Sequence, residues 1–298
     1  MKKYLLNIFT GIILIAIGDF VIGSTLRHFY FEQKTGVLSR ATYSIEETNA
    51  DILIFGSSRA NHHYDTKIIE ATTKLSAYNA GRDGHFIFYQ TALLRATLKR
   101  YTPKFIILDF AGTFEFRQID YDRLSSLLPY YKSHKEIRDI VELKSPFEKY
   151  KLVSSIYPFN STVSTILVSN VRTKDENVYN GYTPLYRDFK GTLISPTNES
   201  NKYEIDQNKY RAFKEFLQLT NEKKIPLLVI NSPRIYRKEK DFSVQLCKEL
   251  CKKYNIPFKD LSNDELFINN KSLFDDATHL NYKGATLFTE KIVKFITE

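Results

Sequence analysis

Several common functional signatures are missing from this sequence of 298 residues. It has no zinc-finger spacing, no dense run of Lys or Arg, and no basic stripe interleaved with stacking aromatics. Nucleic acid is therefore the least favoured partner, although the formal net charge is +9. It also has no Walker-type Gly-Lys-Ser/Thr run and no cluster of metal-binding carboxylates, which argues against phosphoryl transfer.

Cysteine is scarce, and the two that occur, Cys247 and Cys251, match no metal quartet. Four residues apart in a helical pattern, they share one helix face, and we expect two small buried side chains rather than a redox pair. The adjacent His62 and His63 also make a poor metal site, because neighbouring residues rarely point at the same ion. The sequence thus predicts neither a metal nor a cofactor.

A long hydrophobic run occurs once, at the amino terminus, in "MKKYLLNIFTGIILIAIGDFVIGS". The run from Tyr4 to Ile22 has about 19 residues, close to the roughly 20 needed to span a bilayer as a helix. Bulky Ile22 makes a poor signal-peptide cleavage site, and Lys2 and Lys3 favour an amino terminus inside the cell. We predict an uncleaved signal anchor over residues 1–24, with the globular part outside the cytoplasm, in the periplasm. Asp19 is costly in lipid and is expected near the interface or against a partner helix.

Strand and helix patterns alternate after a polar and aromatic connector at 25–50. Short apolar runs without polar alternation suit parallel strands that are buried on both faces. Four such runs lie at 51–55, 105–110, 226–231 and 256–261, and helical patterns lie at 89–100, 207–224, 241–254 and 281–298. The order predicts an α/β domain over 51–298, a flavodoxin-like three-layer sandwich with a mainly parallel sheet. A segment at about 115–205 reads as an insertion, and either a lid over the strand ends or packing against the sheet fits its composition.

Two motifs at opposite ends of this domain carry the chemistry. "DILIFGSSRANHHY" ends the first strand in Gly56-Ser57-Ser58, where an α/β sheet presents side chains to a ligand. "LFDDATHLNYKGA" places Asp276 three residues before His279. A hydroxyl needs a base to become a nucleophile, and a histidine needs a carboxylate to fix its tautomer.

These motifs resemble those of the SGNH or GDSL-like hydrolases. The Gly-Asp-Ser block of that family is matched by Gly56-Ser57-Ser58, and its Asp-x-x-His block is matched by Asp276 to His279. The block "YNAGRDGH" looks like the family's second block, with Gly84 as the glycine. The resemblance implies Ser58 as nucleophile, His279 as base and Asp276 as its orienting carboxylate. It also implies the amides of Ser58 and Gly84 as oxyanion donors.

The third block departs from the family pattern. Family members often have Gly-x-Asn there, whereas "DFAGTFEF" gives Gly112-Thr113-Phe114, and Phe cannot donate a hydrogen bond. Asn61 and Asn231 are conceivable substitutes. Polar residues expected on the strand-end side form the predicted substrate-binding set for an anionic sugar or carboxylate: Arg59, His62, His63, Arg82, Asn231 and Arg234.

Together with the signal anchor predicted from the amino-terminal run, the resemblance implies a membrane-anchored serine esterase or acyltransferase. Its expected substrates are ester groups, O-acetyl groups of an extracytoplasmic polysaccharide foremost. A lipase or thioesterase acting on acyl lipids would use the same three residues. A glycan-binding or assembly protein with an idle site would keep the fold without turnover, and the missing Asn of the third block supports that alternative.

Overall fold

A computed structural model describes residues 1–171, 178–192, 203–236 and 241–297. The chain divides into two compact units. The anchor unit comprises residues 1–42 and 121–175, and the sheet unit comprises residues 43–120 and 176–298. The inserted segment that the sequence places at about 115–205 is therefore shared. Of its described residues, 121–171 belong to the anchor unit, and 115–120, 178–192 and 203–205 belong to the sheet unit.

The sheet unit is built on five parallel strands in the order β2-β1-β3-β4-β5. The strands are β1 (Ile52–Phe55), β2 (Ala77–Asn79), β3 (Phe105–Asp109), β4 (Leu227–Asn231) and β5 (Phe258–Asp260). This order is that of flavodoxin-like proteins, and the α/β class with a parallel sheet is confirmed. All four residues of β1 are buried, as the unbroken apolar run predicts.

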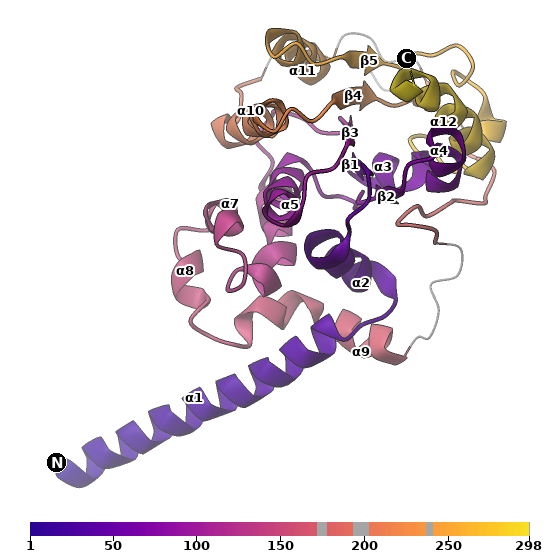
Figure 1. Ribbon diagram of the computed structural model, residues 1–298. Helices are drawn as coiled ribbons and strands as arrows, with labels where there is room; N and C mark the ends of the chain where they lie inside the picture. Colours follow the sequence, from indigo (N-terminus) through magenta and orange to yellow (C-terminus); the bar gives the residue numbers. More distant parts are fainter. Residues whose placement is uncertain (172–177, 193–202, 237–240, 298) are drawn as a thin grey trace. The chain divides into compact units, whose positions relative to one another are not determined.

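Helices cover both faces of the sheet, as Figure 1 shows, with α5, α10 and α11 on one side and α3, α4 and α12 on the other. Successive strand residues point to opposite faces. Ile54 packs in one core with Phe288 and Ile292, whereas the ring of Phe55 meets that of Phe216 on the other face. The helices are α3 (Ser58–His63), α4 (Thr66–Thr73), α5 (Ile87–Arg100), α10 (Gln207–Glu222), α11 (Phe242–Lys253) and α12 (Tyr282–Thr297).

Helices α10 and α11 begin where an aspartate side chain bonds their free amide groups. Asp206 accepts bonds from the amides of Asn208 and Lys209 at the start of α10, and Asp241 does the same for α11. Both cysteines lie buried and unpaired in α11, which confirms the expectation of two small core side chains.

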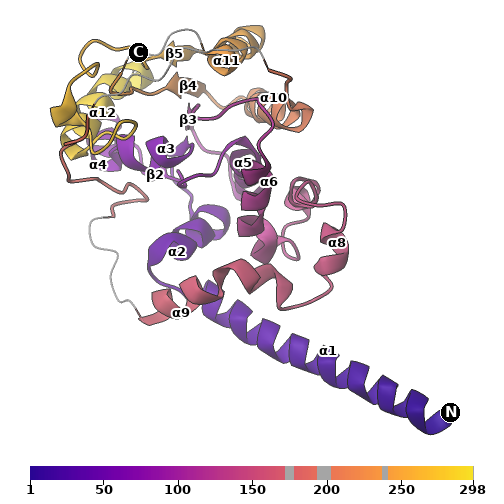
Figure 2. The ribbon, with the colours of Figure 1, turned by 180° about the vertical axis from the view of Figure 1, so that it is seen from behind.

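The anchor unit is helical in its described part. Its long helix is α1 (Lys2–Phe31), which is long and apolar enough to cross a membrane. The shorter helices are α2 (Gly36–Thr42), α7 (Arg138–Glu142), α8 (Glu148–Lys151) and α9 (Val163–Val171), with 3-10 turns at Arg123–Tyr130, Lys135–Ile137 and Tyr157–Thr162. Helix α6 (Gln118–Asp122) leads from the sheet unit into it. Figure 2 shows these short helices from behind.

The connector predicted at 25–50 is mostly helical. It holds the last turns of α1, then α2, then a π-helical turn at Tyr43–Glu47. Helix α1 continues past residue 24 because Tyr30 is buried against the rings of Tyr130 and Phe159, at centroid distances of 6.0 and 5.6 Å. Tertiary packing, which the polar composition of this stretch does not reveal, holds the helix together there.

Candidate active site

The turn after β1 sets Ser58 at the first residue of α3. Gly56 has a φ of 153°, and a Cβ there would lie 2.5 Å from the Cβ of Ala60 and 3.0 Å from the carbonyl oxygen of Asp109. Only glycine fits this close approach of β1, β3 and α3. Ser57 is the buried N-cap residue, and its side chain makes no capping bond.

Ser58, His279 and Asp276 form a hydrogen-bonded chain. The Nε2 atom of His279 lies 2.7 Å from the Oγ atom of Ser58, and its Nδ1 atom lies 2.8 Å from Oδ2 of Asp276. An ionised carboxylate only accepts hydrogen bonds, so Nδ1 carries the proton and donates it to Asp276. The lone pair of Nε2 is then free to accept the proton of the Ser58 hydroxyl, which is the geometry that general-base activation needs.

Asp276 is held by its own loop. Its Oδ1 atom accepts bonds from the amides of Thr278 and His279 at 2.8 and 2.9 Å, and from the Thr278 hydroxyl at 3.0 Å. Partial burial raises the pKa of Asp276, but the bonds from His279 and from these amides outweigh it and hold the pKa well below its usual range. The carboxylate is therefore ionised when it faces the imidazole.

His63 supports the loop that carries His279. It is fully buried, and its Nε2 atom accepts a bond from the amide of Leu280 at 3.0 Å. Burial, with smaller contributions from nearby His279 and Arg59, lowers the pKa of His63 well below its usual value. These contacts favour a positioning role for His63 over the predicted binding of substrate.

His62 lies beside His279, with the two rings perpendicular and their centroids 5.6 Å apart. Its Nδ1 atom is 2.6 Å from the carbonyl oxygen of Thr183, and its Nε2 atom is 3.4 Å from Oδ2 of Asp83. Both ring nitrogens of His62 therefore face oxygen atoms. Burial raises the pKa of Asp83, but the bond and charge of His62 prevail and lower it to about 2. Asp83 lies in the quoted block "YNAGRDGH", where the family resemblance singles out only Gly84, whereas Thr183 belongs to no motif.

Gly84 lies in a turn that the structure attaches to the Ser58 loop. The amide of Arg82 donates to the carbonyl oxygen of Gly56 at 3.1 Å, and the amide of His85 closes the turn on Arg82. Gly84 has a φ of 68°, the left-handed conformation that glycine adopts readily. The turn therefore lies beside the Ser58 loop. The role of the Gly84 amide as oxyanion donor stays a prediction.

Phe114 of the third block faces the core. Its side chain is 1% exposed and packs against Phe110 and Phe213, with centroid distances of 5.5 and 5.6 Å. The two candidate replacements have other partners. Asn231 donates from Nδ2 to Asp260 at 3.0 Å, and Asn61 donates from Nδ2 to Asp83 at 2.8 Å.

Arg59 is buried and ties three strand ends together. Its guanidinium donates to the carbonyl oxygens of Ser232 and Phe110 at 2.9 Å each and to Oδ1 of Asn231 at 3.2 Å. It also lies 3.5 Å from the carboxylate of Asp109, which accepts a bond from the Tyr64 hydroxyl at 2.7 Å. These contacts favour a structural role for Arg59 over substrate binding. Sequence reasoning missed Asp109. Its position at the end of the apolar run "FIILD" was the signal that could have indicated it.

The other two arginines of the predicted set are Arg82 and Arg234. Arg82 is largely buried, with its guanidinium 5.3 Å from the ring centroid of Tyr89. Burial, together with the charge of nearby Arg59, lowers the pKa of Arg234 to about 10. Arg82 and Arg234 stay predicted substrate-binding residues.

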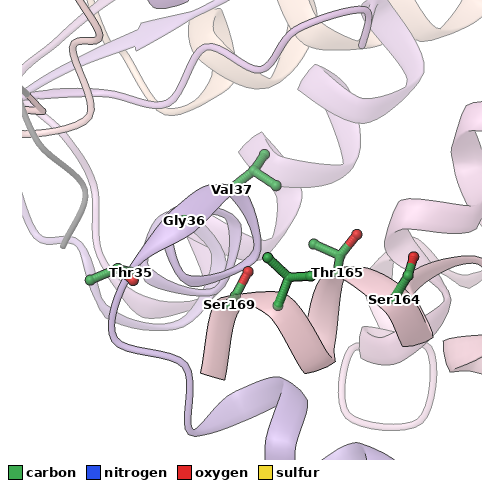
Figure 3. A pocket seen from close by; sticks show the side chains of 7 residues that line it. Thr35, Gly36, Val37, Ser164, Thr165 and Ser169 are labelled. Carbon is green, nitrogen blue, oxygen red and sulfur yellow. The ribbon is translucent and has the colours of Figure 1, made fainter. Parts of the chain in front are cut away.

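The anchor unit has a pocket of its own, of about 390 Å³ (Figure 3). Its walls come from the start of α2 and from α9, and Figure 3 shows hydroxyl side chains of Thr35, Ser164, Thr165 and Ser169 around it.

Among the residues that the structure describes, no group of three or more His, Cys, Asp or Glu is arranged to hold a metal ion.

Comparison with known proteins gives structural likenesses alone. Neither a protein-family model nor a curated protein matches the sequence. An acetyl xylan esterase, AlAXEase, is similar to this chain with a TM-score of 0.42 and 12% sequence identity, over 82% of this chain and 99% of that one. A protein of the G-D-S-L family from Desulfitobacterium hafniense DCB-2 is similar with a TM-score of 0.39 and 11% identity, over 82% of this chain and 97% of that one. At such low scores and identities, the likenesses say nothing about the activity or substrate of this chain.

Proposed function

We propose that this protein is a serine ester hydrolase with Ser58 as its nucleophile. The observation that carries the proposal is the chain of hydrogen bonds from Ser58 through His279 to Asp276. An isolated serine is a poor nucleophile at neutral pH, and a histidine with an oriented tautomer is what activates it.

The reaction proceeds in two halves. As the Ser58 Oγ atom attacks the ester carbonyl, its proton passes to Nε2 of His279, and Asp276 stabilises the resulting imidazolium. The amides of Ser58 and Gly84 receive the oxyanion. The tetrahedral intermediate then expels the alcohol, which takes the proton from Nε2, and leaves Ser58 acylated. Water, activated by the same nitrogen, releases the acid and restores the hydroxyl.

We further propose O-acetyl groups of an extracytoplasmic polysaccharide as the substrate, with a sugar hydroxyl replacing water if the enzyme is a transferase. Support comes from an exposed aromatic pair next to the site. Tyr186 and Tyr282 are 57% and 41% exposed, and their ring centroids are 5.4 Å apart. Tyr282 follows His279 by three residues, and its amide donates to the carbonyl oxygen of Leu185. Sugar rings stack on such aromatic faces, because C–H groups meet the π-system.

The test uses full-length protein in detergent micelles, because the carboxyl-terminal part of α1 packs within the anchor unit through Gly23 and Tyr30. Hydrolysis of p-nitrophenyl acetate and labelling by a fluorophosphonate are expected in the wild type and absent in Ser58→Ala. A Tyr186→Ala/Tyr282→Ala variant should keep that hydrolysis but lose deacetylation of an O-acetylated polysaccharide. An equal loss of activity on p-nitrophenyl acetate and on the polysaccharide would contradict the proposal that Tyr186 and Tyr282 stack on sugar rings. Acetyl transfer is read by mass spectrometry of an added glycan acceptor.

One observation favours a second candidate, a glycan-binding protein with an idle site. Phe114 is in the core, and both candidate Asn residues bond other groups. Losing one oxyanion donor typically costs about 10² to 10³ in rate. A folded wild type that neither labels nor turns over, yet retains polysaccharide on an affinity matrix, would establish this alternative.

A further inference from the structure

The first observation is how α1 is attached within the anchor unit. The carboxylate of Asp19 accepts bonds from the Ser154 hydroxyl at 2.5 Å and from the amides of Ser155 and Ile156 at 2.6 and 3.4 Å. One turn later, a Cβ on Gly23 would lie 2.4 Å from the carbonyl carbon of Ser155. The turn at 154–156 therefore packs closely against one face of α1. It also supplies the hydrogen-bond partners of the Asp19 carboxylate, which would be unfavourable in lipid without them.

The second observation is that α1 stays apolar and exposed on its other faces at this same level. Phe20, Val21 and Ile22 are 65%, 55% and 52% exposed. The run from Tyr4 to Ile22 measures about 28 Å at roughly 1.5 Å per residue, close to the roughly 30 Å of a bilayer core. Asp19 is one turn before the end of that run. If α1 spans a bilayer, the turn at 154–156 reaches the boundary between acyl chains and headgroups.

The third observation concerns the surface beside this turn, which we call the interfacial segment and define as residues 145–157. It exposes three apolar side chains, with Phe147 66%, Tyr150 63% and Val153 81% exposed. Its acidic residue, Glu148, is fully buried and bonds Lys151 at 3.0 Å and the Tyr157 hydroxyl at 2.5 Å.

Because Glu148 is buried, the exposed charge of the interfacial segment is positive. Lys149 is exposed, with its Nζ atom 5.1 Å from the ring centroid of Tyr150. Aromatic and aliphatic side chains flanked by lysines suit the interface of an anionic bilayer, where the rings enter the headgroup layer and the ammonium groups meet lipid phosphates.

We propose that the interfacial segment lies on the membrane that α1 spans, with Phe147, Tyr150 and Val153 inserted at the headgroup level of a bilayer containing anionic lipid. The anchor unit then has two membrane contacts, a spanning helix and a surface segment, joined by the bonds of Asp19. A single helix leaves a domain free to tilt and rotate, whereas this second contact fixes the orientation of the anchor unit. The proposal also requires that α1 is retained in the mature protein.

The chain offers a clean optical test because it contains no tryptophan. Single variants Phe147→Trp, Tyr150→Trp and Val153→Trp are reconstituted at full length in vesicles of phosphatidylcholine and phosphatidylglycerol at a ratio of 3:1. Phe20→Trp reports on α1, and Leu266→Trp is the matched control on an exposed residue of the sheet unit. Quenching is read with lipids brominated at shallow or at deep positions of the acyl chains.

We expect blue-shifted emission and shallow quenching for the three segment variants, quenching for Phe20→Trp, and neither effect for Leu266→Trp. Lys149→Glu in the Tyr150→Trp background should reduce the quenching severalfold in anionic vesicles and have little effect in pure phosphatidylcholine. Quenching of Phe20→Trp alone would overturn the surface contact while leaving the span intact. A blue shift that depends on the protein-to-lipid ratio, without bromine quenching, would assign the surface to a second copy of the chain and also overturn the proposal.

Discussion

The Oγ atom of Ser58 and the Nε2 atom of His279 lie 2.7 Å apart, although 221 residues separate them in the sequence. The sheet and α12 bring them together. Ser58 lies three residues after the end of β1, and His279 lies three residues before the start of α12, which packs on the face that α3 and α4 share. The His63 ring joins the two loops by accepting the amide of Leu280. The core of the sheet unit thus holds the geometry on which the proposed chemistry depends.

Ser58→Ala and His279→Ala should each abolish hydrolysis of p-nitrophenyl acetate. The expected loss in kcat is about 10⁴-fold or more, because Ser58, His279 and Asp276 act as a unit and removal of Ser58 or His279 abolishes the activation that all three provide. Stopped-flow or plate assays of the purified full chain measure it. Ser57→Ala is the matched control, because the Ser57 side chain makes no capping bond, and it should keep activity within a few fold of the wild type. Equal losses in Ser57→Ala and Ser58→Ala would contradict the assignment of the nucleophile.

Asp276→Asn should lower kcat by about 10² to 10⁴ while the protein stays folded. The amide nitrogen of Asn can donate to Nδ1 of His279, which favours the tautomer with the proton on Nε2 and removes the acceptor for Ser58. Asp275→Asn is the neighbouring control. The Asp275 carboxylate bonds Arg187 and not His279, so we expect little change in kcat from that variant. Proton NMR of the histidine ring reports the tautomer directly.

The sequence anticipates the part of the site that follows from local patterns. The apolar runs predict four of the five strands, and the two motifs predict that Ser58, Asp276 and His279 meet. What it leaves open depends on side-chain direction. Phe114 occupies the expected third-block position, yet its ring points into the core, and no periodicity in "DFAGTFEF" reveals that direction.

Structural roles that depend on partners distant in the sequence also cannot be predicted from local patterns. Arg59 lies next to the motif serine and suggests an anion site, but its partners Phe110 and Ser232 directly follow β3 and β4, more than fifty residues away. The helical course of residues 25–31 likewise depends on the contacts of Tyr30 with Tyr130 and Phe159, which are distant in the sequence. Such pairings are properties of the folded core and carry no local signature.

Arg59→Met should destabilise the sheet unit by about 3 kcal/mol, because it leaves the buried carboxylate of Asp109 without its cationic neighbour. The expected result is a lower urea midpoint with an unchanged slope. Activity should fall in parallel, since the same guanidinium bonds Asn231 and Ser232. Arg211→Met, on the exposed face of α10, is the control and should change stability by less than about 0.5 kcal/mol. A variant as stable as the wild type but with a raised KM would restore Arg59 as a substrate contact.

Phe114→Asn tests whether the third block can be converted to the family pattern by one substitution. The ring is buried among Phe110, Phe213 and Tyr210, so an Asn there removes aromatic packing and places an amide in an apolar core. We expect a loss of about 3 to 5 kcal/mol in unfolding free energy and no gain in kcat. Phe114→Leu keeps an apolar side chain and should cost less while leaving kcat close to the wild-type value. A rise in kcat for Phe114→Asn, measured on protein shown to be folded by circular dichroism, would mean that the position reaches the oxyanion after all.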